Sequence, residues 1–292
     1  MSKLESLLKN ENIIEKGYNF AFLDEFTKRE VRRNILKAIA IPGYQVPFGS
    51  RDMPLARGWG TGGIQITLSI IGKSDVLKVI DQGCDDSINA LNIKNLISRM
   101  TGIKTTEDTK EANIIQTRHR IPEEKMTEEQ ILVFQVPEPE PLRKIEPSEV
   151  ETRRMHAQKD YSAMWLHLYE DIVRHAQITV SSCYPVMVNS RYIMDTTPVP
   201  RWDVPKLHKS GAINIFCAGR EKRIYAIPPF TEVEPLEFED YNFSVEDFAG
   251  KACEKCRSTE TYLDEILDES TGIRRYFCSD TSYCEKVRQG KA

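Results

Sequence analysis

Apolar residues recur along the chain with two different periods, and the period changes from segment to segment. Residues 24–40 and 87–100 repeat at helical spacing, and Pro42 and Gly102 follow as stop signals. Residues 151–175 repeat in the same way, with large aromatic side chains on a narrow stripe. The pattern therefore predicts three amphipathic helices.

Shorter segments alternate apolar and polar residues or are apolar throughout. IQITLSI (64–70) alternates strictly, which predicts a half-buried strand. VLKVI, ANIIQTRHRIP, ILVFQV, INIFC and RIYAI predict further strands, and a hairpin is expected around Asn189-Ser190. Helices and strands are mixed without a regular βαβ repeat, so the predicted class is α+β: a mixed α/β core with a helical insertion and a small C-terminal cysteine-rich metal-binding module.

Composition divides the chain into a body that is interrupted once and a separate tail. The proline-acidic stretch PEPEPLRKIEP sustains neither a helix nor a central strand, so it is expected to be an extended connector that opens an insertion. The predicted parts are an N-terminal extension (1–16), a core domain with a glycine-rich loop (17–136), an insertion (137–190), the continued core domain (191–245) and a four-cysteine module (246–292).

The bulk composition is that of a folded protein of the cytoplasm. The 292 residues are 40% hydrophobic and 29% charged, and no apolar run reaches the roughly 18 residues of a membrane helix. The net charge of -4 argues against nucleic acid or a membrane surface as a partner, because such binding needs excess Lys and Arg. Clustered thiols in a reducing compartment more often bind metal or do redox chemistry than form disulfides.

Six of the fifteen glycines fall between positions 43 and 63. Gly43 follows Pro42, which by itself predicts a turn. The run GWGTGG supplies Gly58, Gly60, Gly62 and Gly63. Their backbone amides could meet phosphate or a cofactor, or the run could be a flexible lead into the next element. It lacks a Walker lysine, so it is not a nucleotide fingerprint.

Two basic clusters are candidates for binding substrate phosphate. Guanidinium groups suit phosphate dianions because they form paired hydrogen bonds, although charge runs usually face solvent. The clusters are Arg118, His119 and Arg120, and Arg220, Lys222 and Arg223.

Four of the seven cysteines lie in the tail as Cys253-x2-Cys256-x21-Cys278-x5-Cys284. Two close pairs of thiols separated by a hairpin can converge on one metal ion. Spacing alone favours a structural zinc ribbon, but four thiolates also bind iron-sulfur clusters, and three ligands with one free reactive thiol remain an alternative. Single cysteines at 84, 183 and 217 are expected to pack in the core.

Several motifs together resemble one family. They are the four-cysteine spacing, IPGYQVPFG, GWGTGGIQ, QTRHRIPE, PEPLR, GREKRIYAIPPFT and CSDTSYC. The chain resembles the PhnJ family, the radical subunit of the bacterial carbon-phosphorus lyase complex, from about Gly17 to Cys284. That family lacks the common CxxxCxxC signature of S-adenosylmethionine radical enzymes, and so does this sequence.

The resemblance implies a radical mechanism. Cys253, Cys256 and Cys278 would hold a [4Fe-4S] cluster that binds S-adenosylmethionine, Gly43 would carry a glycyl radical, and Cys284 would be the reactive thiol. The substrate would be alpha-D-ribose 1-methylphosphonate 5-phosphate, and the products its 1,2-cyclic phosphate 5-phosphate and methane.

The resemblance also implies partner subunits. His119 would contribute to a zinc or phosphate site at an interface with another core subunit. The insertion would dock an ATP-binding-cassette-type subunit through a stripe formed by Trp165, Leu168, Tyr169 and Ile172. The alternative from another class is a non-catalytic zinc-ribbon protein that serves as a scaffold in a multiprotein assembly.

Overall fold

The computed structural model describes most of the chain. It covers residues 3–10, 23–49, 61–81, 85–118, 121–136, 141–144, 146–164, 166–167, 170, 185–189, 191–194, 204–218, 222–235 and 250–291. Over these ranges, no helix combines the length and the apolar character that crossing a bilayer requires.

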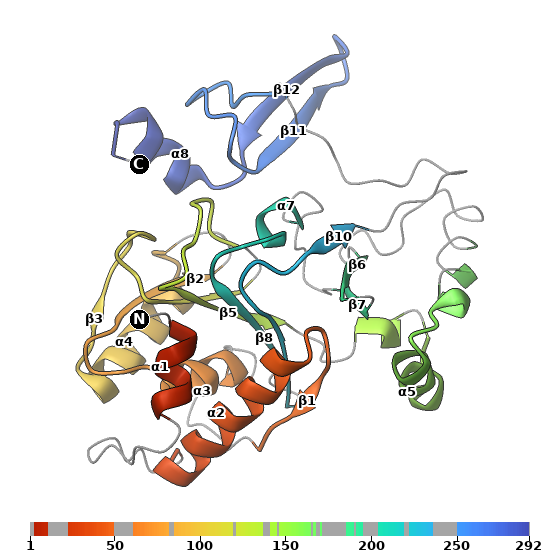
Figure 1. Ribbon diagram of the computed structural model, residues 1–292. Coiled ribbons are helices and arrows are strands. Elements are labelled where there is room, and N and C mark those ends of the chain that lie inside the picture. Colours follow the sequence, from red (N-terminus) through yellow and green to blue (C-terminus); the bar gives the residue numbers. More distant parts are fainter. Residues whose placement is uncertain are drawn as a thin grey trace.

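A seven-stranded mixed sheet forms the centre of the molecule (Figure 1). Strands β3, β2, β4, β5 and β8 are parallel neighbours, and β9 and β1 continue the sheet antiparallel at one edge. The strands are β1 (Val46–Pro47), β2 (Val76–Asp81), β3 (Lys104–Thr105), β4 (Ile114–Arg118), β5 (Ile131–Val136), β8 (Ile213–Ala218) and β9 (Arg223–Ile227). The mixed α/β core expected from the sequence is confirmed.

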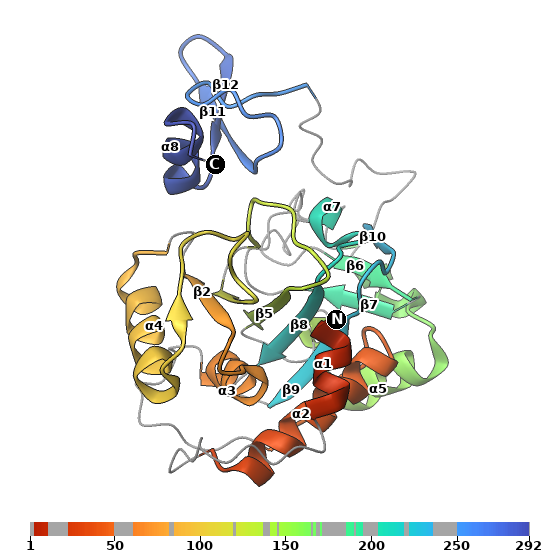
Figure 2. The same ribbon diagram turned by 60° about the vertical axis from the view of Figure 1, so that its left-hand side comes forward.

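Four helices cover one face of this sheet (Figures 1 and 2). They are α1 (Lys3–Asn10), α2 (Glu25–Ala40), α3 (Thr61–Ile70) and α4 (Ile88–Thr101). Their apolar side chains, such as Ile35 of α2 and Ile97 of α4, pack with Leu77 and Val133 of the strands. Because the other face is covered too, the central strands are apolar runs rather than alternating ones.

Helices α2 and α4 occur where the sequence predicts them. Asp24 caps α2 by accepting a hydrogen bond from the N–H of Thr27, and Ser87 caps α4 by accepting one from Ala90. Gly102 ends α4 in the left-handed conformation, with φ 71°. Helix α4 carries the chain from β2 to the parallel strand β3, which makes a βαβ unit that the sequence pattern did not reveal.

The strand predicted for IQITLSI is wrong, because these residues belong to helix α3. The polar members of the alternation, Gln65, Thr67 and Ser69, are as buried as the apolar ones. Thr67 donates to Gln116 Oε1 at 2.8 Å, and Ser69 donates to the carbonyl of Gln65 at 2.6 Å. The helix is surrounded on all sides, so its polar positions mark internal hydrogen bonds rather than a solvent face.

The insertion and its neighbours cover the second face of the sheet. Leu142, Met155, Val188 and Leu207 pack there against Phe134 of β5. The elements are the 3-10 helix η1 (Pro141–Lys144), α5 (Glu149–Gln158), β6 (Pro185–Val188), β7 (Arg191–Met194), α7 (Val204–Leu207) and β10 (Val233–Pro235). Strands β6 and β7 form the expected hairpin around Asn189-Ser190, and β10 joins it as a third strand.

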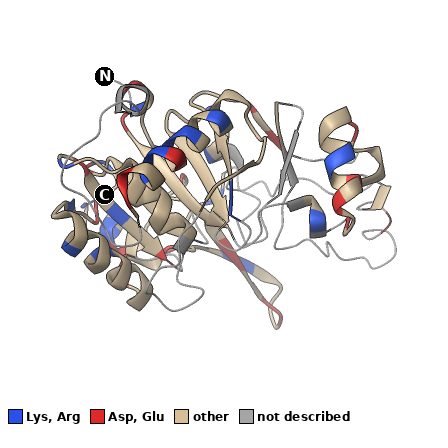
Figure 3. Cartoon of the chain, turned by 90° about the horizontal axis from the view of Figure 1, so that it is seen from below, with Lys and Arg blue, Asp and Glu red and all other residues tan. Residues whose placement is uncertain are grey.

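The long helix predicted for residues 151–175 is also wrong. Helix α5 is capped by Ser148 and ends at Lys159, whose φ of 53° is left-handed and stops the helical hydrogen-bond pattern. Acidic residues occupy the first turn of α5 and arginines follow (Figure 3), and Arg154 forms an ion pair with Glu151 at 2.6 Å. Because the break falls within a polar run, the apolar stripe could not reveal it.

The C-terminal module is a two-stranded hairpin followed by a helix (Figure 1). Strands β11 (Leu263–Asp268) and β12 (Ile273–Cys278) are antiparallel, with Leu263 opposite Cys278, and α8 spans Thr281–Arg288. Apart from the cysteines, its small core contains Leu263 and the half-buried Tyr276. A hairpin of this size is marginal alone, so the cysteines and the contact with the body must support it.

Candidate metal centre

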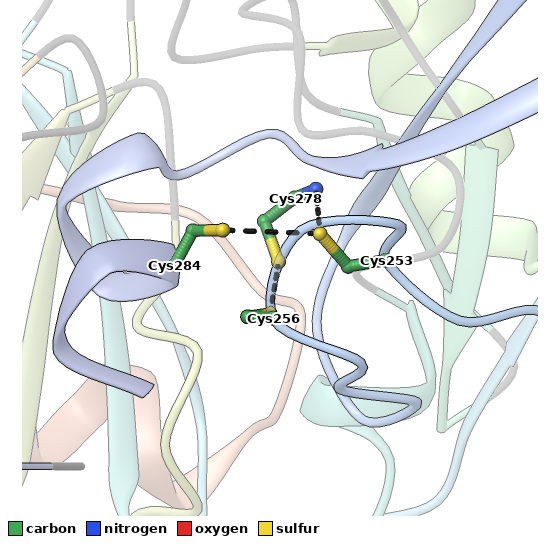
Figure 4. A group of neighbouring side chains, drawn as sticks. All are labelled: Cys253, Cys256, Cys278 and Cys284. Carbon is green, nitrogen blue, oxygen red and sulfur yellow. Dashed lines mark hydrogen bonds between the residues drawn. The ribbon is translucent and has the colours of Figure 1, made fainter. Parts of the chain in front are cut away.

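The four cysteines of the tail converge on one point (Figure 4). Cys253 and Cys256 lie in the loop before β11, Cys278 ends β12, and Cys284 lies in α8. Their four Sγ atoms all lie within 4.8 Å of one another, and none is in a disulfide. The expected cluster of four thiols is therefore present.

Local hydrogen bonds explain why the thiols meet. The N–H of Glu254, between the first two cysteines, donates to the carbonyl of Tyr276 on β12 at 2.8 Å. Asp280 caps α8 by accepting from the N–H of Tyr283, and its carbonyl accepts the N–H of Cys284 at 3.0 Å. The loop and the helix are thus held on opposite sides of the end of β12.

The thiols have different acidities. Burial raises the pKa of Cys253, but the backbone N–H groups of Cys256, Cys278 and Lys255 stabilise the thiolate and set that pKa at about 6. Burial, followed by hydrogen bonds with the sulfurs of Cys256 and Cys253, raises the pKa of Cys284 to about 11. In the metal-free chain Cys253 is a thiolate at neutral pH, whereas Cys284 keeps its proton.

The donor set suits both metals that the spacing allows, but the separations favour one ion. The sulfurs of Cys253 and Cys284 are 3.8 Å apart, and those of Cys256 and Cys278 are 3.4 Å apart. Four thiolates about 2.3 Å from one tetrahedral ion stand about 3.8 Å apart. Thiolates bound to different irons stand further apart, so a [4Fe-4S] cluster fits the donor chemistry but requires the thiols to separate.

A cavity opens beside two of the thiols. It has a volume of about 420 Å³ and is lined by both Cys278 and Cys284. Phe277 provides an aromatic wall, Lys255 and Arg288 provide positive charge, and Asp264 and Glu285 provide negative charge. This volume lies in the range of small-molecule sites, and its lining combines apolar surface with charges of both signs.

Candidate residues for phosphate meet at another place, the carboxyl edge of the parallel strands. Arg118 ends β4 and holds Asp81, at the end of β2, with two hydrogen bonds of 2.8 and 3.1 Å. The N–H of Gly63, in the first turn of α3, donates to Gln135 of β5 at 2.7 Å. Open α/β sheets bind ligands at this edge, and the N-terminus of a helix favours anions.

Two further candidates share that edge. Lys222 and Arg223 lie at the turn from β8 to β9, and Arg223 donates to Gln45 at 3.3 Å. Gly62 and Gly63 are buried, and a Cβ added to Gly63 would lie 3.0 Å from Gln135 Oε1. A side chain at position 63 would therefore push the Gln135 and Gln116 amide groups aside by a few tenths of an ångström.

Gly43 lies in the turn that the sequence predicts. The N–H of Tyr44 donates to the carbonyl of Ile41 at 2.9 Å, and Gly43 has φ 75° after Pro42, the arrangement of a type II turn. Its own N–H donates to Ala226 of β9 at 3.3 Å. This contact of Gly43 is with the central sheet, whereas Cys284 lies in the cysteine module, which Figures 1 and 2 show apart from that sheet and its helices.

Several predicted residues lie outside the described ranges. These are Gly58, Gly60, His119, Arg120 and Arg220, the stripe residues Trp165, Leu168, Tyr169 and Ile172, and the single cysteines Cys84 and Cys183. Cys217 is described and is fully buried in β8, as expected for a core residue.

Sequence reasoning missed two residues that shape the thiol site. Thr261 hydrogen-bonds the sulfur of Cys278 at 3.2 Å, and Glu123 of the body accepts the N–H of Tyr262 at 2.9 Å. The only available signal was the proximity of Thr261 to the first cysteine pair, since Glu123 is distant in sequence.

Comparisons with known proteins agree on one family. The family model for "Phosphonate metabolism protein PhnJ" matches residues 16–290. The chain is 58% identical over 275 residues to "Alpha-D-ribose 1-methylphosphonate 5-phosphate C-P lyase" of Escherichia coli (strain K12), covering 94% of this chain and 98% of the relative. It is 57% identical over 271 residues to the protein of that name from Rhizobium meliloti (strain 1021), covering 93% and 91%.

Proposed function

Because the chain belongs to the PhnJ family of phosphonate metabolism proteins, we propose that it is a carbon-phosphorus lyase that cleaves alpha-D-ribose 1-methylphosphonate 5-phosphate. Both relatives carry this substrate in their names and align along more than nine tenths of the chain. The observation that carries the proposal is the convergence of four thiols next to a cavity of substrate size.

The cofactors of this reaction would be a [4Fe-4S] cluster on Cys253, Cys256 and Cys278, and S-adenosylmethionine. Together they supply one electron and a carbon radical that abstracts hydrogen. The chain supplies the two groups that relay the radical. Gly43 loses a hydrogen atom from Cα, where glycine alone has no side chain to crowd a planar radical.

Cys284 then gives its thiol hydrogen to Gly43 and becomes a thiyl radical. The raised pKa of Cys284 supports this role, because a protonated thiol retains the hydrogen atom that the relay moves. Its sulfur forms a bond to phosphorus while the bond between phosphorus and the methyl group breaks. The methyl radical takes a hydrogen atom from Gly43 to give methane, which restores the glycyl radical.

The ribose 2-hydroxyl completes the reaction. Its oxygen attacks the phosphorus of the thiophosphate, the bond from phosphorus to Cys284 breaks, and the hydroxyl proton returns to the sulfur. The product is the 1,2-cyclic phosphate 5-phosphate. Atoms and electrons balance, since the methyl group gains one hydrogen atom and the radical is regenerated.

The substrate phosphate is proposed to bind at the carboxyl edge of the sheet. Arg118, Lys222 and Arg223 supply positive charge there, and α3 directs its N-terminal amides toward the same edge. Arg120, Arg220 and the glycines of GWGTGG are neighbours of these residues in the sequence, and we propose that they belong to the same phosphate site. Arg118 would keep its pair with Asp81, which orients the guanidinium.

The relay requires Gly43 and Cys284 to approach each other, so the active arrangement differs from the one described above. We assign this rearrangement to the assembled complex, in which other carbon-phosphorus lyase subunits contact the chain. His119 would join a zinc site at one such interface, and the insertion would dock an ATP-binding-cassette-type subunit. The exposed apolar side chains of Val150 and Leu166 in the insertion support a docking role.

The second candidate function is a zinc-ribbon scaffold without catalysis. The separations of 3.4 and 3.8 Å between sulfur pairs favour it, because they match a single tetrahedral ion. In that case Cys284 is the fourth ligand and Gly43 is only a turn residue.

Metal analysis decides between the two. Protein reconstituted without oxygen should contain about four irons per chain and give the paramagnetic signal of a reduced four-iron cluster. One tightly held zinc that iron does not replace would favour the scaffold.

The glycyl relay is tested with Gly43→Ala in the assembled complex. Alanine at φ 75° costs about 1 kcal/mol, so Gly102→Ala, at φ 71° with open space around it, is the matched control. We expect Gly43→Ala to abolish methane release and Gly102→Ala to retain it, as followed by gas chromatography. Methane release from Gly43→Ala at the control's rate would refute the relay.

A further inference from the structure

We infer that Glu123, in the loop between β4 and β5, is the positioning residue that fixes the thiol site on the body of the protein. This inference concerns contacts of this chain alone and holds whichever metal the thiols bind. Its evidence is a buried network that runs from Glu123 to the sulfur of Cys278.

The carboxylate of Glu123 is almost fully buried, with 1% of its side chain exposed. Oε2 accepts the backbone N–H of Tyr262 at 2.9 Å and lies 3.1 Å from Nζ of Lys206. Lys206 lies on α7, so three segments that are distant in sequence meet at this single oxygen atom. A buried carboxylate is stable only with such partners, which makes its geometry strict.

The ammonium of Lys206 also contacts the module directly. Its Nζ lies 4.2 Å from the centre of the Tyr262 ring, in the position of a cation–π contact, and also donates to the carbonyl of Glu123. The same cation therefore neutralises Glu123 and holds the Tyr262 ring. The ring itself is 2% exposed.

From Tyr262 the network continues to the thiols. The carbonyl of Tyr262 accepts the N–H of Ser279 at 2.9 Å, next to Cys278. The hydroxyl of Thr261, the preceding residue, hydrogen-bonds the sulfur of Cys278 at 3.2 Å. One hydrogen bond thus joins the Tyr262 backbone to the residue after Cys278, and the other joins Thr261 to the sulfur of Cys278.

The body also contacts the module at a second place, helix α8. Lys286 of α8 donates to the carbonyl of Glu107 at 3.2 Å, and a small cavity between Glu123 and Tyr283 of α8 has room for about one water molecule. Lys286 is half-buried, but its hydrogen bond is exposed to solvent, so this contact is weaker than that of the buried carboxylate. Glu123 is therefore the anchor, and α8 is a secondary contact.

Groups that hydrogen-bond a metal ligand orient it, and their loss typically changes metal affinity about 10- to 100-fold. Thr261 makes such a bond to Cys278, and Glu123 acts on it through the neighbouring Tyr262. The test uses the full chain loaded with Zn²⁺ in four forms: wild type, Glu123→Ala, Glu123→Gln and Lys206→Met. Glu128→Gln is the matched control, because this residue lies in the same loop and is exposed. The readouts are Zn²⁺ transfer to a chromophoric chelator and hydrogen exchange of the amides of Tyr262 and Ser279.

We expect Glu123→Ala to raise Zn²⁺ transfer and exchange of both amides at least about 10-fold, and Lys206→Met to raise them less, because it keeps the acceptor. Glu123→Gln should fall between them, since its amide oxygen can still accept the N–H of Tyr262. The control should match the wild type. Exchange within β4 and β5 should stay unchanged in every variant.

Two results would overturn the inference. One is that Glu123→Ala and the control give the same Zn²⁺ transfer and the same exchange at Tyr262. The other is that exchange in β4 and β5 rises together with that at Tyr262, because Glu123 would then stabilise the whole fold rather than position the module. If Glu123→Ala does not fold, Zn²⁺ transfer and amide exchange at Tyr262 are compared between the control and the variants Lys206→Met and Glu123→Gln instead.

Discussion

Cys253 and Cys284 are chemically alike and lie 3.8 Å apart, but their surroundings give them different protonation states. Cys253 is the target of three backbone N–H groups, which stabilise a negative charge despite burial. Cys284 is buried beside other sulfurs, which favours its neutral form. The surroundings thus separate Cys253 from Cys284, but burial also raises the pKa of Cys278, a proposed ligand, so acidity alone does not identify the hydrogen donor.

This difference predicts a titration in the metal-free chain. The thiolate of Cys253 forms as the pH rises through about 6, far below the usual thiol range, and that of Cys284 only near 11. The thiolate absorbance of the metal-free wild type should therefore include a step near pH 6. Cys253→Ser should remove that step and Cys284→Ser should keep it; a step that survives in Cys253→Ser would contradict the assignment.

Sequence motifs located most of the residues that the site needs. The four cysteines were predicted because their spacing is local information, and Gly43 was placed in a turn because Pro42 precedes it. Glu123 was not found, since a single acidic residue carries no pattern and its partner Tyr262 is 139 positions away. Contacts between distant segments become visible only after the chain has folded.

At the scale of elements, predictions were correct where one face of a segment meets solvent and its ends carry capping signals. Helices α2 and α4 have both. Helix α3 has no face toward solvent, since it is buried all around, and its alternating pattern was mistaken for a strand. Helix α5 ends at a left-handed lysine, for which the local sequence gives no warning because lysine rarely adopts that conformation.

Helix α8 offers a test at this scale, because its N-cap positions Cys284. Asp280→Ala removes the acceptor for the N–H of Tyr283 and should destabilise the helix by about 1 kcal/mol. Amides of α8 should exchange several-fold faster, and Zn²⁺ should leave the thiol site faster. Asp280→Asn keeps an acceptor and should resemble the wild type; equal exchange in the two variants would show that the cap does not hold the helix.

At the scale of the whole molecule, the body and the cysteine module differ in what holds them together. The body has two large apolar cores, one on each face of its sheet. The module has one small core, in which four of the buried or half-buried members are the cysteines themselves. Its stability should therefore increase when metal binds, as it does in other small thiolate-bound domains.

Removing the metal should consequently make the module open more often, although its contacts through Glu123 and Lys286 keep most metal-free chains folded, and the sheet should not change. After treatment with a strong chelator and reductant, we expect faster protease cleavage and faster amide exchange within residues 250–291, while β4, β5 and β8 stay protected. Adding Zn²⁺ or iron back should restore protection. Equal loss of protection in the sheet and the module would mean that the two fold as one unit.

The contact between Glu123 and Tyr262 also implies that, during synthesis, the body emerges and folds before the cysteine module docks on it. The loop that carries Glu123 is complete when less than half of the chain has left the ribosome, whereas its partner is among the last segments to emerge. The docking surface is therefore ready before the module arrives, and the thiols meet their metal in the presence of a folded body. A truncated chain that ends before Cys253 would leave the carboxylate of Glu123 paired with Lys206 but without the N–H of Tyr262.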